Sequence, residues 1–192
     1  TKSHQVFGGY LQSSLKCPHC SGVQRRVARF MDLSVAISAT TRTIESALDE
    51  YTRTEILGDG EEWECPSCDN KRVKAEKQVT ICSAPLNFVL HLKRFDFVRT
   101  SSPPFFLRRK ISHHVKFSET LCLDGYMSES STDVGELYEL YGVIVHLGTS
   151  AEYGHYISFI KTGNGKWYKM DDANVRVSDV QEVLDQKAYM LF

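Results

Sequence analysis

The sequence contains no apolar run that approaches the roughly 20 residues required by a membrane-spanning helix. Its first ten residues, TKSHQVFGGY, also lack the apolar stretch of a secretory signal peptide. Basic residues are not in excess, because 23 Lys and Arg stand against 24 Asp and Glu. Proteins that bind nucleic acid usually carry a clustered basic excess. The sequence therefore predicts neither a membrane protein nor a nucleic-acid-binding protein.

Cysteines are few, six in 192 residues, which is far below the density of a disulfide-stabilised secreted scaffold. Four of the six form two Cys-x-x-Cys pairs, a pattern typical of metal binding in compartments where thiols stay reduced. We therefore expect a cytoplasmic or nuclear protein, or one shared between these compartments.

The composition that is present, 42% hydrophobic and 24% charged residues, is that of a globular domain. Strand-like segments dominate, and two shorter stretches have helical features, the first with Thr43 as its N-cap. The expected fold class is α+β with mainly antiparallel sheet. The predicted strands are 6–16, 26–38, 79–95, 137–148, 154–161, 166–172 and 188–192, and the predicted helices are 43–56 and 180–186.

The two Cys-x-x-Cys pairs predict a metal centre. Cys17 and Cys20 lie in CPHC, Cys65 and Cys68 lie in CPSC, and 44 residues separate the pairs. Each pair bends tightly enough for both thiolates to reach one ion, and two pairs complete a tetrahedral four-cysteine zinc site. Such a closed site leaves no position for substrate, so we expect a structural Zn²⁺ in a zinc ribbon.

A predicted hairpin carries the candidate catalytic residues. Alternating apolar residues flank the sequence TGNG, in which Asn-Gly is a turn signal. A three-residue loop centred on Gly163 would place His155 opposite Asp171; a four-residue loop would place it opposite Asp172, and a tight Asn-Gly turn opposite Asn174. Each of these three partners could orient the imidazole and leave its other nitrogen free to accept a proton. A histidine beside an aspartate on a hairpin is, however, more often an ordinary surface pair.

Three other histidines are weaker candidates for catalysis. His146 lies in the apolar segment VIVHLG, which favours a histidine packed in the core. His113 and His114 follow a charged segment and are expected to be solvated.

Several ordered segments together resemble the ubiquitin-specific protease family of cysteine peptidases. They are FGGYLQSSLKCPHC, ECPSC, LNFVLHLKRF, KISHHVKFSETLCLDGYM, YELYGVIVHLG, GHYISFIK, WYKMDD and AYMLF. The resemblance covers nearly the whole chain and is specific, because these segments coincide in order and spacing. It implies a papain-like fold of thumb, palm and fingers. Residues 1–192 would be part of such a protease domain, with zinc-ribbon fingers over about 6–85, the palm over about 86–192, and the thumb absent.

The resemblance also implies an activity, the cleavage of the peptide or isopeptide bond after the C-terminal glycine of ubiquitin. By position, His155 corresponds to the general base and Asp171 to the residue that orients it, and Asp172 would be an accessory polar partner. Cys17, Cys20, Cys65 and Cys68 correspond to the zinc ligands. The implied partners are ubiquitin and ubiquitinated proteins.

One part of the family pattern is missing. Nothing in the sequence matches the box, roughly Asn-x-x-Asn-Thr-Cys-Tyr, that carries the nucleophile. The two cysteines outside the metal pairs, Cys82 and Cys122, are expected to be small buried residues rather than reactive thiolates. We therefore expect a fragment that is inactive alone and belongs to an active protease. The alternative is a ubiquitin-binding module without catalysis, against which stands the retained pair of His155 and Asp171.

Overall fold

A computed structural model describes residues 2–99, 101–102, 106–131, 133, 137–150 and 153–192. The chain divides into two compact units. Unit 1 comprises Thr1–Met31, Asp49–Leu86 and Leu123–Glu136, and unit 2 comprises Asp32–Leu48, Asn87–Cys122 and Leu137–Phe192. The units differ in two places from the predicted division near residue 85, since Asp32–Leu48 belongs to the second and Leu123–Glu136 to the first.

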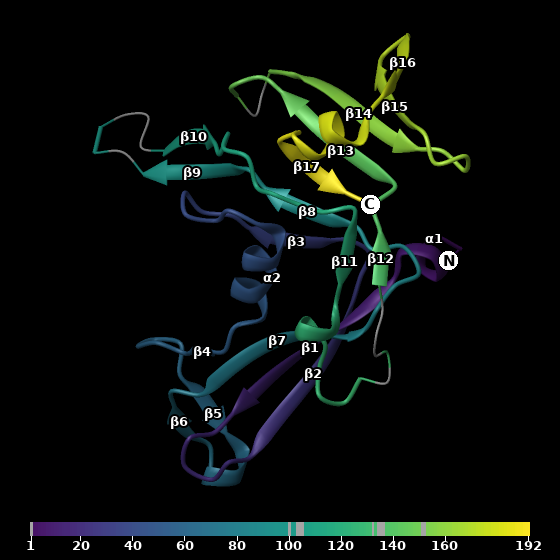
Figure 1. Cartoon of the computed structure of the whole chain (residues 1–192). Coiled ribbons are helices and arrows are strands. Elements are labelled where there is room, and N and C mark those ends of the chain that lie inside the picture. Colours follow the sequence, from purple (N-terminus) through teal and green to yellow (C-terminus); the bar gives the residue numbers. More distant parts are fainter. Residues whose placement is uncertain (1, 100, 103–105, 132, 134–136, 151–152) are drawn as a thin grey trace. The chain divides into compact units, whose positions relative to one another are not determined.

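Unit 1 is built on a four-stranded antiparallel sheet in the order β2-β1-β7-β4 (Figure 1). Its long strands are β1 (Gly9–Lys16), β2 (Val23–Phe30) and β7 (Glu76–Ser83), and β4 is Glu55–Ile56. A separate hairpin of β5 (Trp63–Cys65) and β6 (Lys71–Val73) encloses the 3-10 turn η1 (Pro66–Cys68). Unit 1 also contains α1 (Lys2–Phe7) and η2 (Asp124–Tyr126).

Unit 2 is built on a seven-stranded sheet in the order β16-β15-β14-β13-β17-β8-β3, in which only the β3–β8 pair is parallel. The strands are β3 (Leu33–Ala36), β8 (Leu90–Lys93), β13 (Gly142–Leu147), β14 (His155–Lys161), β15 (Trp167–Asp171), β16 (Asn174–Ser178) and β17 (Ala188–Leu191). Two short antiparallel pairs accompany it: β9 (Phe95–Arg99) with β10 (Phe106–Lys110), and β11 (Thr120–Cys122) with β12 (Leu137–Glu139). The helices are α2 (Ile44–Thr52), which continues into unit 1, and α3 (Val180–Leu184).

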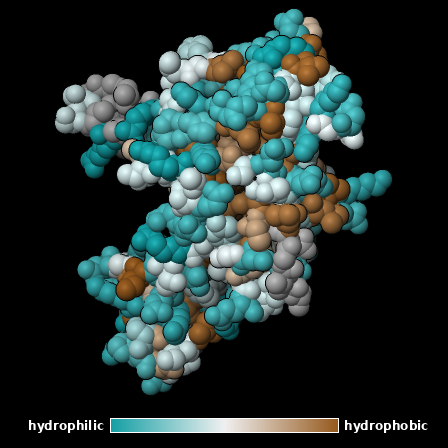
Figure 2. Space-filling view, in the orientation of Figure 1, coloured by the Kyte–Doolittle hydropathy of each residue, from teal (hydrophilic) through white to brown (hydrophobic). Residues whose placement is uncertain are grey.

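Alternation along β14 divides its side chains between the two faces of the sheet. Ile157 and Phe159 are buried, whereas Tyr156 and Ile160 point the other way and are exposed. Val175 and Val177 on β16 are also exposed, and Figure 2 shows brown apolar atoms in the region where Figure 1 labels β16. One face of the sheet is thus packed, and it is the face to which His155 belongs.

A buried arginine ties together the part of unit 2 around β8. Arg94 is 1% exposed, and its guanidinium donates to the carbonyls of Ala188 at 2.6 Å, Ile111 at 2.9 Å and His113 at 3.0 Å. Burial lowers the pKa of Arg94 to about 10. The side chain therefore acts as a fixed donor to two backbone segments, residues 111–113 and β17.

The predicted α+β class with mainly antiparallel sheet is confirmed. Thr43 caps α2 as expected, since its hydroxyl accepts from the Ser46 N–H at 3.1 Å, but the helix ends at Thr52 rather than near Ile56. The single strand predicted over 79–95 is instead divided among β7, β8 and β9. Within the described residues, no helix has the length and apolar character needed to cross a bilayer.

Candidate metal centre and candidate active site

The two Cys-x-x-Cys pairs of unit 1 form tight backbone turns. In the first, the Ser21 N–H donates to the Cys17 carbonyl at 3.1 Å; in the second, the Asn70 N–H donates to the Cys65 carbonyl at 3.0 Å. The backbone turns back through left-handed conformations after each pair, with φ of 57° at Ser21 and 51° at Asp69. Each turn therefore directs two thiols toward the same point.

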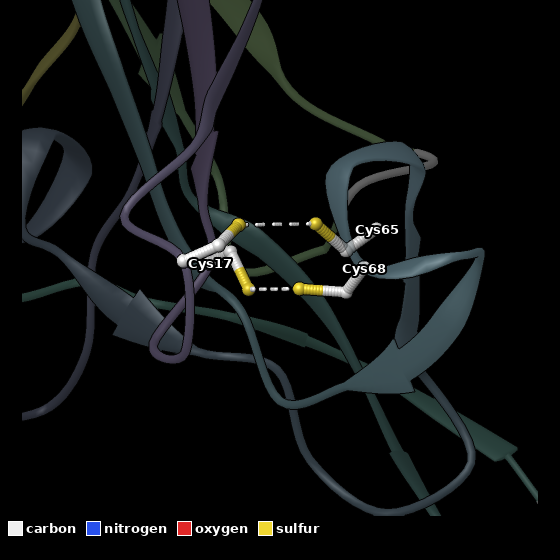
Figure 3. A group of neighbouring side chains, drawn as sticks. Cys17, Cys65 and Cys68 are labelled. Atoms are coloured by element: carbon white, nitrogen blue, oxygen red, sulfur yellow. Dashed lines mark hydrogen bonds between the residues drawn. The ribbon is translucent and has the colours of Figure 1, made fainter.

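The four thiols lie together, with all Sγ atoms within 4.8 Å of one another. Two of their contacts are 3.9 Å between the Sγ atoms of Cys17 and Cys68 and 3.6 Å between those of Cys20 and Cys65 (dashed lines in Figure 3). A tetrahedral ion with metal–sulfur bonds of about 2.3 Å separates its sulfur ligands by about 3.8 Å. The two given distances are close to this separation, so the four cysteines fit a tetrahedral zinc site. All six cysteines of the chain are free of disulfides.

The surroundings of the cysteine cluster are apolar on one side and open on the other. Cys17 and Cys65 are buried with Val73 and Ala75, whereas Cys20 is exposed. The pKa values of the thiols differ within the cluster. Hydrogen bonding from the Cys20 backbone lowers the pKa of Cys17 to about 7. Hydrogen bonding with the Cys20 side chain raises the pKa of Cys68 to about 12. A bound metal ion would replace the protons shared between these thiols, since thiols bind metals as thiolates.

In unit 2 the structure brings His155 and Asp171 into contact. His155 begins β14 and Asp171 ends β15, and Nε2 of the imidazole lies 2.6 Å from Oδ1 of the carboxylate. Both side chains are partly exposed, 41% for His155 and 33% for Asp171. Because Nε2 is engaged, Nδ1 is the ring nitrogen left for another group.

The hairpin that joins these residues has none of the three predicted registers. Lys161 pairs with Trp167, so the loop has five residues, 162–166, and the Ser158–Met170 pair fixes the strands. Continued to His155, this register would place Ala173 opposite the histidine. Thr162 and Lys166 close this loop, the Thr162 N–H donating to the Lys166 carbonyl at 2.9 Å. His155 therefore reaches Asp171 diagonally, a neighbour relation within the range of long side chains.

Electrostatics within the pair favour the ionic form of both partners. The hydrogen bond with Asp171 raises the pKa of His155 above its ordinary value, and the charge of Asp172 adds to the effect. The reciprocal hydrogen bond lowers the pKa of Asp171, and Lys169 adds to that lowering. The pair is thus arranged to stabilise an imidazolium.

The other two predicted partners of His155 occupy different positions. Asp172 is exposed in the turn after β15, with φ of 50°, and its carboxylate belongs to a group with His155 and Asp171 whose ligand atoms lie within 4.8 Å of one another. Asn174 pairs with Asp171 through the backbone as β16 begins, and it is exposed. Asp172 therefore acts on the histidine through its charge, while Asp171 supplies the hydrogen bond.

His113, His114 and His146 are held by the fold. His146 is 6% exposed and packs its ring against Phe95 and Tyr156, as expected of a core histidine. His113 and His114, expected to be solvated, are partly buried instead, and their Nε2 atoms lie 2.8 Å and 2.9 Å from the carbonyls of Thr41 and Leu184. Their backbone partners are remote in sequence, so the local pattern could not reveal them.

Two features around His155 were not evident from the sequence. A Cβ atom at Gly154 would lie only 2.0 Å from Nε2 of His146, so glycine at this position is required by packing against the buried ring. Lys110 donates from Nζ to the carbonyls of His146 and Gly148, both at 2.7 Å. Lys110 thereby holds the C-terminal end of β13, just before the segment that leads to His155. No local sequence motif predicts this contact.

Comparison with known proteins decides the family. A family model described as ubiquitin carboxyl-terminal hydrolase matches residues 1–192. The chain belongs to this family. Over 188 residues it is 38% identical to ubiquitin carboxyl-terminal hydrolase 25 of Arabidopsis thaliana, covering 98% of the chain and 27% of that hydrolase. It is also 38% identical to the human ubiquitin carboxyl-terminal hydrolase 17-like protein 12 over 193 residues, covering all of the chain and 34% of the human protein.

Solved structures agree with this hydrolase assignment. A chain in the SAGA Ubp8/Sgf11/Sus1/Sgf73 DUB module bound to ubiquitin aldehyde superposes with a TM-score of 0.87 at 33% identity, covering 100% of this chain and 42% of that one. A chain in a SAGA DUB module bound to monoubiquitin gives a TM-score of 0.86 at 34% identity, covering 98% of this chain and 40% of that one. The hydrolase-family chain thus spans less than half the length of these relatives.

Proposed function

We propose that residues 1–192 supply the general base, its orienting acid and the zinc-binding fingers of a deubiquitinating cysteine hydrolase. The observation that carries this proposal is the 2.6 Å contact between His155 Nε2 and Asp171 Oδ1, which leaves Nδ1 available to a nucleophile. Family membership supports the substrate class, since the relatives are named ubiquitin hydrolases. The reaction is cleavage of the peptide or isopeptide bond after the C-terminal glycine of ubiquitin.

In this proposal Asp171 accepts the Nε2–H hydrogen bond of His155 and fixes the plane of the ring. Nδ1 takes the proton of a cysteine thiol, and the imidazolium that forms is stabilised by the carboxylate. The thiolate attacks the carbonyl carbon of ubiquitin's C-terminal glycine, and the imidazolium gives its proton to the amine that departs. Water, deprotonated by the same imidazole, then hydrolyses the thioester and releases ubiquitin and the thiol. Asp172 strengthens the electrostatic stabilisation through its nearby charge.

The nucleophile in this scheme comes from a segment outside residues 1–192. Four cysteines gather in the metal cluster, and among the residues that the structure describes no hydrogen bond joins the thiol of Cys82 or Cys122 to His155. Without a thiol near Nδ1, the base has no proton to accept. We expect this chain alone to be inactive for that reason.

The four-cysteine cluster has a structural role in the proposal. A zinc ion bound by Cys17, Cys20, Cys65 and Cys68 supplies cross-linking and no reactive position, because four thiolates fill its tetrahedral shell. It would hold the β5–β6 hairpin against the turn that follows β1. The proposed partners are ubiquitin and ubiquitinated proteins, without nucleic acid or membrane, in the cytoplasm or nucleus.

The proposal is tested by hydrolysis of a fluorogenic substrate that carries ubiquitin's C-terminus. We expect turnover by the full-length protein that contains this sequence, its loss in His155→Ala, and none by residues 1–192 alone. Turnover by the short chain that disappears in Cys82→Ala or Cys122→Ala would overturn the placement of the nucleophile. A full-length protein that binds ubiquitin without hydrolysing the substrate would instead establish the non-catalytic ubiquitin-binding module.

A further inference from the structure

A series of ionic contacts lies beside the candidate dyad on the same face of the sheet. Lys169 sits two residues before Asp171 on β15, and its Nζ lies 3.3 Å from Oδ2 of that carboxylate. His155 uses the other oxygen, Oδ1. Each oxygen of Asp171 therefore has its own cationic or cation-forming partner. We propose that Lys169 is a positioning residue, which locks the Asp171 carboxylate so that its other oxygen stays aimed at His155.

Two contacts are needed because an aspartate has a soft terminal torsion. The χ2 angle of aspartate is broad and roughly two-fold, so a single hydrogen bond leaves the carboxylate free to swing. A second contact on the opposite oxygen fixes the plane. Asp171 also borders a depression of about 390 Å³, lined by Lys169, Asp171, Ala173, Asn174, Val175 and Arg176, through which water can compete for the carboxylate. Lys169 occupies the oxygen that water would otherwise take.

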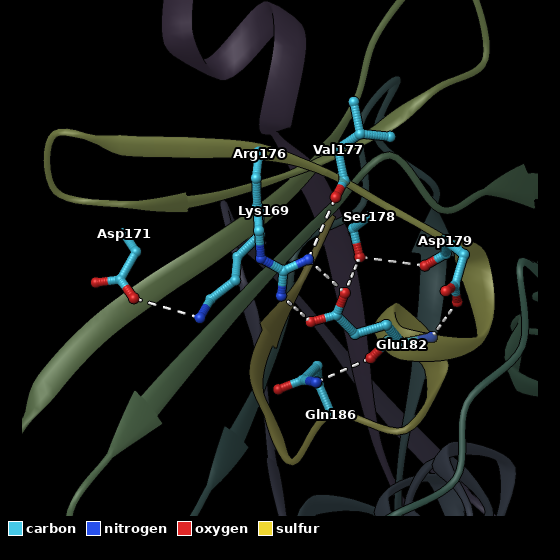
Figure 4. A network of polar contacts seen from close by, with 8 residues as sticks. All are labelled: Lys169, Asp171, Arg176, Val177, Ser178, Asp179, Glu182 and Gln186. Atoms are coloured by element: carbon cyan, nitrogen blue, oxygen red, sulfur yellow. Dashed lines mark hydrogen bonds and ion pairs between the residues drawn. The ribbon is translucent and has the colours of Figure 1, made fainter.

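The neighbouring strand explains why Lys169 turns toward Asp171. Arg176 on β16 pairs directly opposite Lys169, and like charges in opposed positions repel. Arg176 is drawn away by Glu182 of α3, to which it makes a two-point contact that includes 2.9 Å from Nη1 to Oε2 (Figure 4). Lys169 makes its ion pair with Asp171, while its charge also helps to lower the pKa of Glu182.

The helix that carries Glu182 is itself well fixed. Asp179 caps α3 by accepting from the Glu182 N–H at 2.7 Å, and Ser178 donates from Oγ to the Glu182 carboxylate at 2.7 Å. The hydrogen bonds from Arg176 and Ser178 lower the pKa of Glu182 to about 2, so it stays charged at neutral pH. The stem of Lys169 is held as well, since its side chain is 22% exposed and lies across from the buried Phe159.

This inference rests on the proposed function, because Asp171 orients a base only if His155 is one. Its test uses the full-length enzyme with Lys169→Met, Lys169→Arg and the control Lys166→Met, which removes an exposed lysine from the same hairpin. Loss of orientation should lower kcat about tenfold in Lys169→Met with KM for the ubiquitin substrate unchanged. Lys169→Arg should restore most of the rate, and Lys166→Met should leave it intact.

A spectroscopic readout separates positioning from general stability. The Nε2–H proton of His155 in its short hydrogen bond should give a downfield NMR signal that is weakened in Lys169→Met and retained in Lys169→Arg and Lys166→Met. If Lys169→Met does not fold, Lys169→Gln replaces it with the same expectation. Unchanged kcat and an unchanged signal in the lysine variant would overturn the proposal. A signal that depends on Lys169 in an enzyme without any turnover would uphold the positioning and reject the proposed hydrolase function.

Discussion

His155 and Asp171 meet diagonally across the β14–β15 hairpin, with Nε2 2.6 Å from Oδ1 although the strand register would place Ala173 opposite the histidine. The contact is therefore made by side-chain reach rather than by cross-strand pairing. It depends on the direction of the Asp171 carboxylate, which makes the pair sensitive to small changes in that residue.

Replacing Asp171 by asparagine should lower the pKa of His155 toward its ordinary 6.5, because the hydrogen bond with Asp171 is the main cause of the raised value. Because the pKa of His155 is raised in the folded state, this residue stabilises the fold below about pH 6.5. The stabilisation is lost as the pH rises through the pKa of the folded state. Because the pKa of Asp171 is lowered in the folded state, this residue stabilises the fold above about pH 3.8. The stabilisation is lost as the pH falls through the pKa of the folded state. The Tm difference between wild type and Asp171→Asn should thus be largest between about pH 4 and 6.5.

The control for this measurement is Asp172→Asn, which removes a neighbouring charge without removing a hydrogen bond to His155. NMR titration of the histidine ring should show a smaller shift of its pKa than in Asp171→Asn. Equal shifts in the two variants would contradict the assignment of Asp171 as the hydrogen-bonding partner.

Replacing His155 by alanine should reduce kcat of the full-length enzyme by about 10³-fold or more, because both thiol activation and leaving-group protonation depend on it. Asp171→Ala should cost less if the charge of Asp172 partly substitutes for the lost carboxylate. Steady-state hydrolysis of a ubiquitin substrate measures both losses. Near-normal turnover in His155→Ala would remove it from the mechanism, and equal losses in the two variants would argue against any substitution by Asp172.

Replacing Cys65 by serine should abolish stoichiometric zinc binding and lower the Tm, since Cys65 is a buried member of the four-cysteine cluster and metal binding is coupled to folding. Cys122→Ser is the matched control, because this thiol, which the sequence wrongly predicted to be buried, is exposed and lies outside the cluster. Zinc content and thermal unfolding are the measurements. An unchanged Tm in Cys65→Ser, or full loss of zinc in Cys122→Ser, would count against a structural four-cysteine site.

The cysteine pairs could be interpreted from the sequence because a Cys-x-x-Cys turn is local, and two such turns leave few arrangements other than one shared ion. The His155 hairpin could be located from the sequence, but its register could not. Thr162 and Lys166 belong to the loop, and turn propensities alone do not predict this. Several contacts around the site could not be predicted from the sequence at all. Lys110 bonds to the carbonyls of His146 and Gly148, far along the chain, and a local sequence pattern does not contain that information. The contacts of Lys169 with Asp171 and of Arg176 with Glu182 are close in sequence, but no motif of the sequence marks them.

Arg94 offers a test of this remote organisation, since one buried side chain joins the carbonyls of Ala188, Ile111 and His113. Arg94→Ala should destabilise the fold by roughly 3 kcal/mol, because it leaves buried carbonyls without donors and opens a cavity. The exposed Arg25→Ala on β2 is the control and should change stability by less than about 0.5 kcal/mol. Chemical denaturation of both variants measures the difference. A loss as small for Arg94 as for Arg25 would mean that β8 and β17 hold together without the guanidinium, and that the buried arginine serves another purpose.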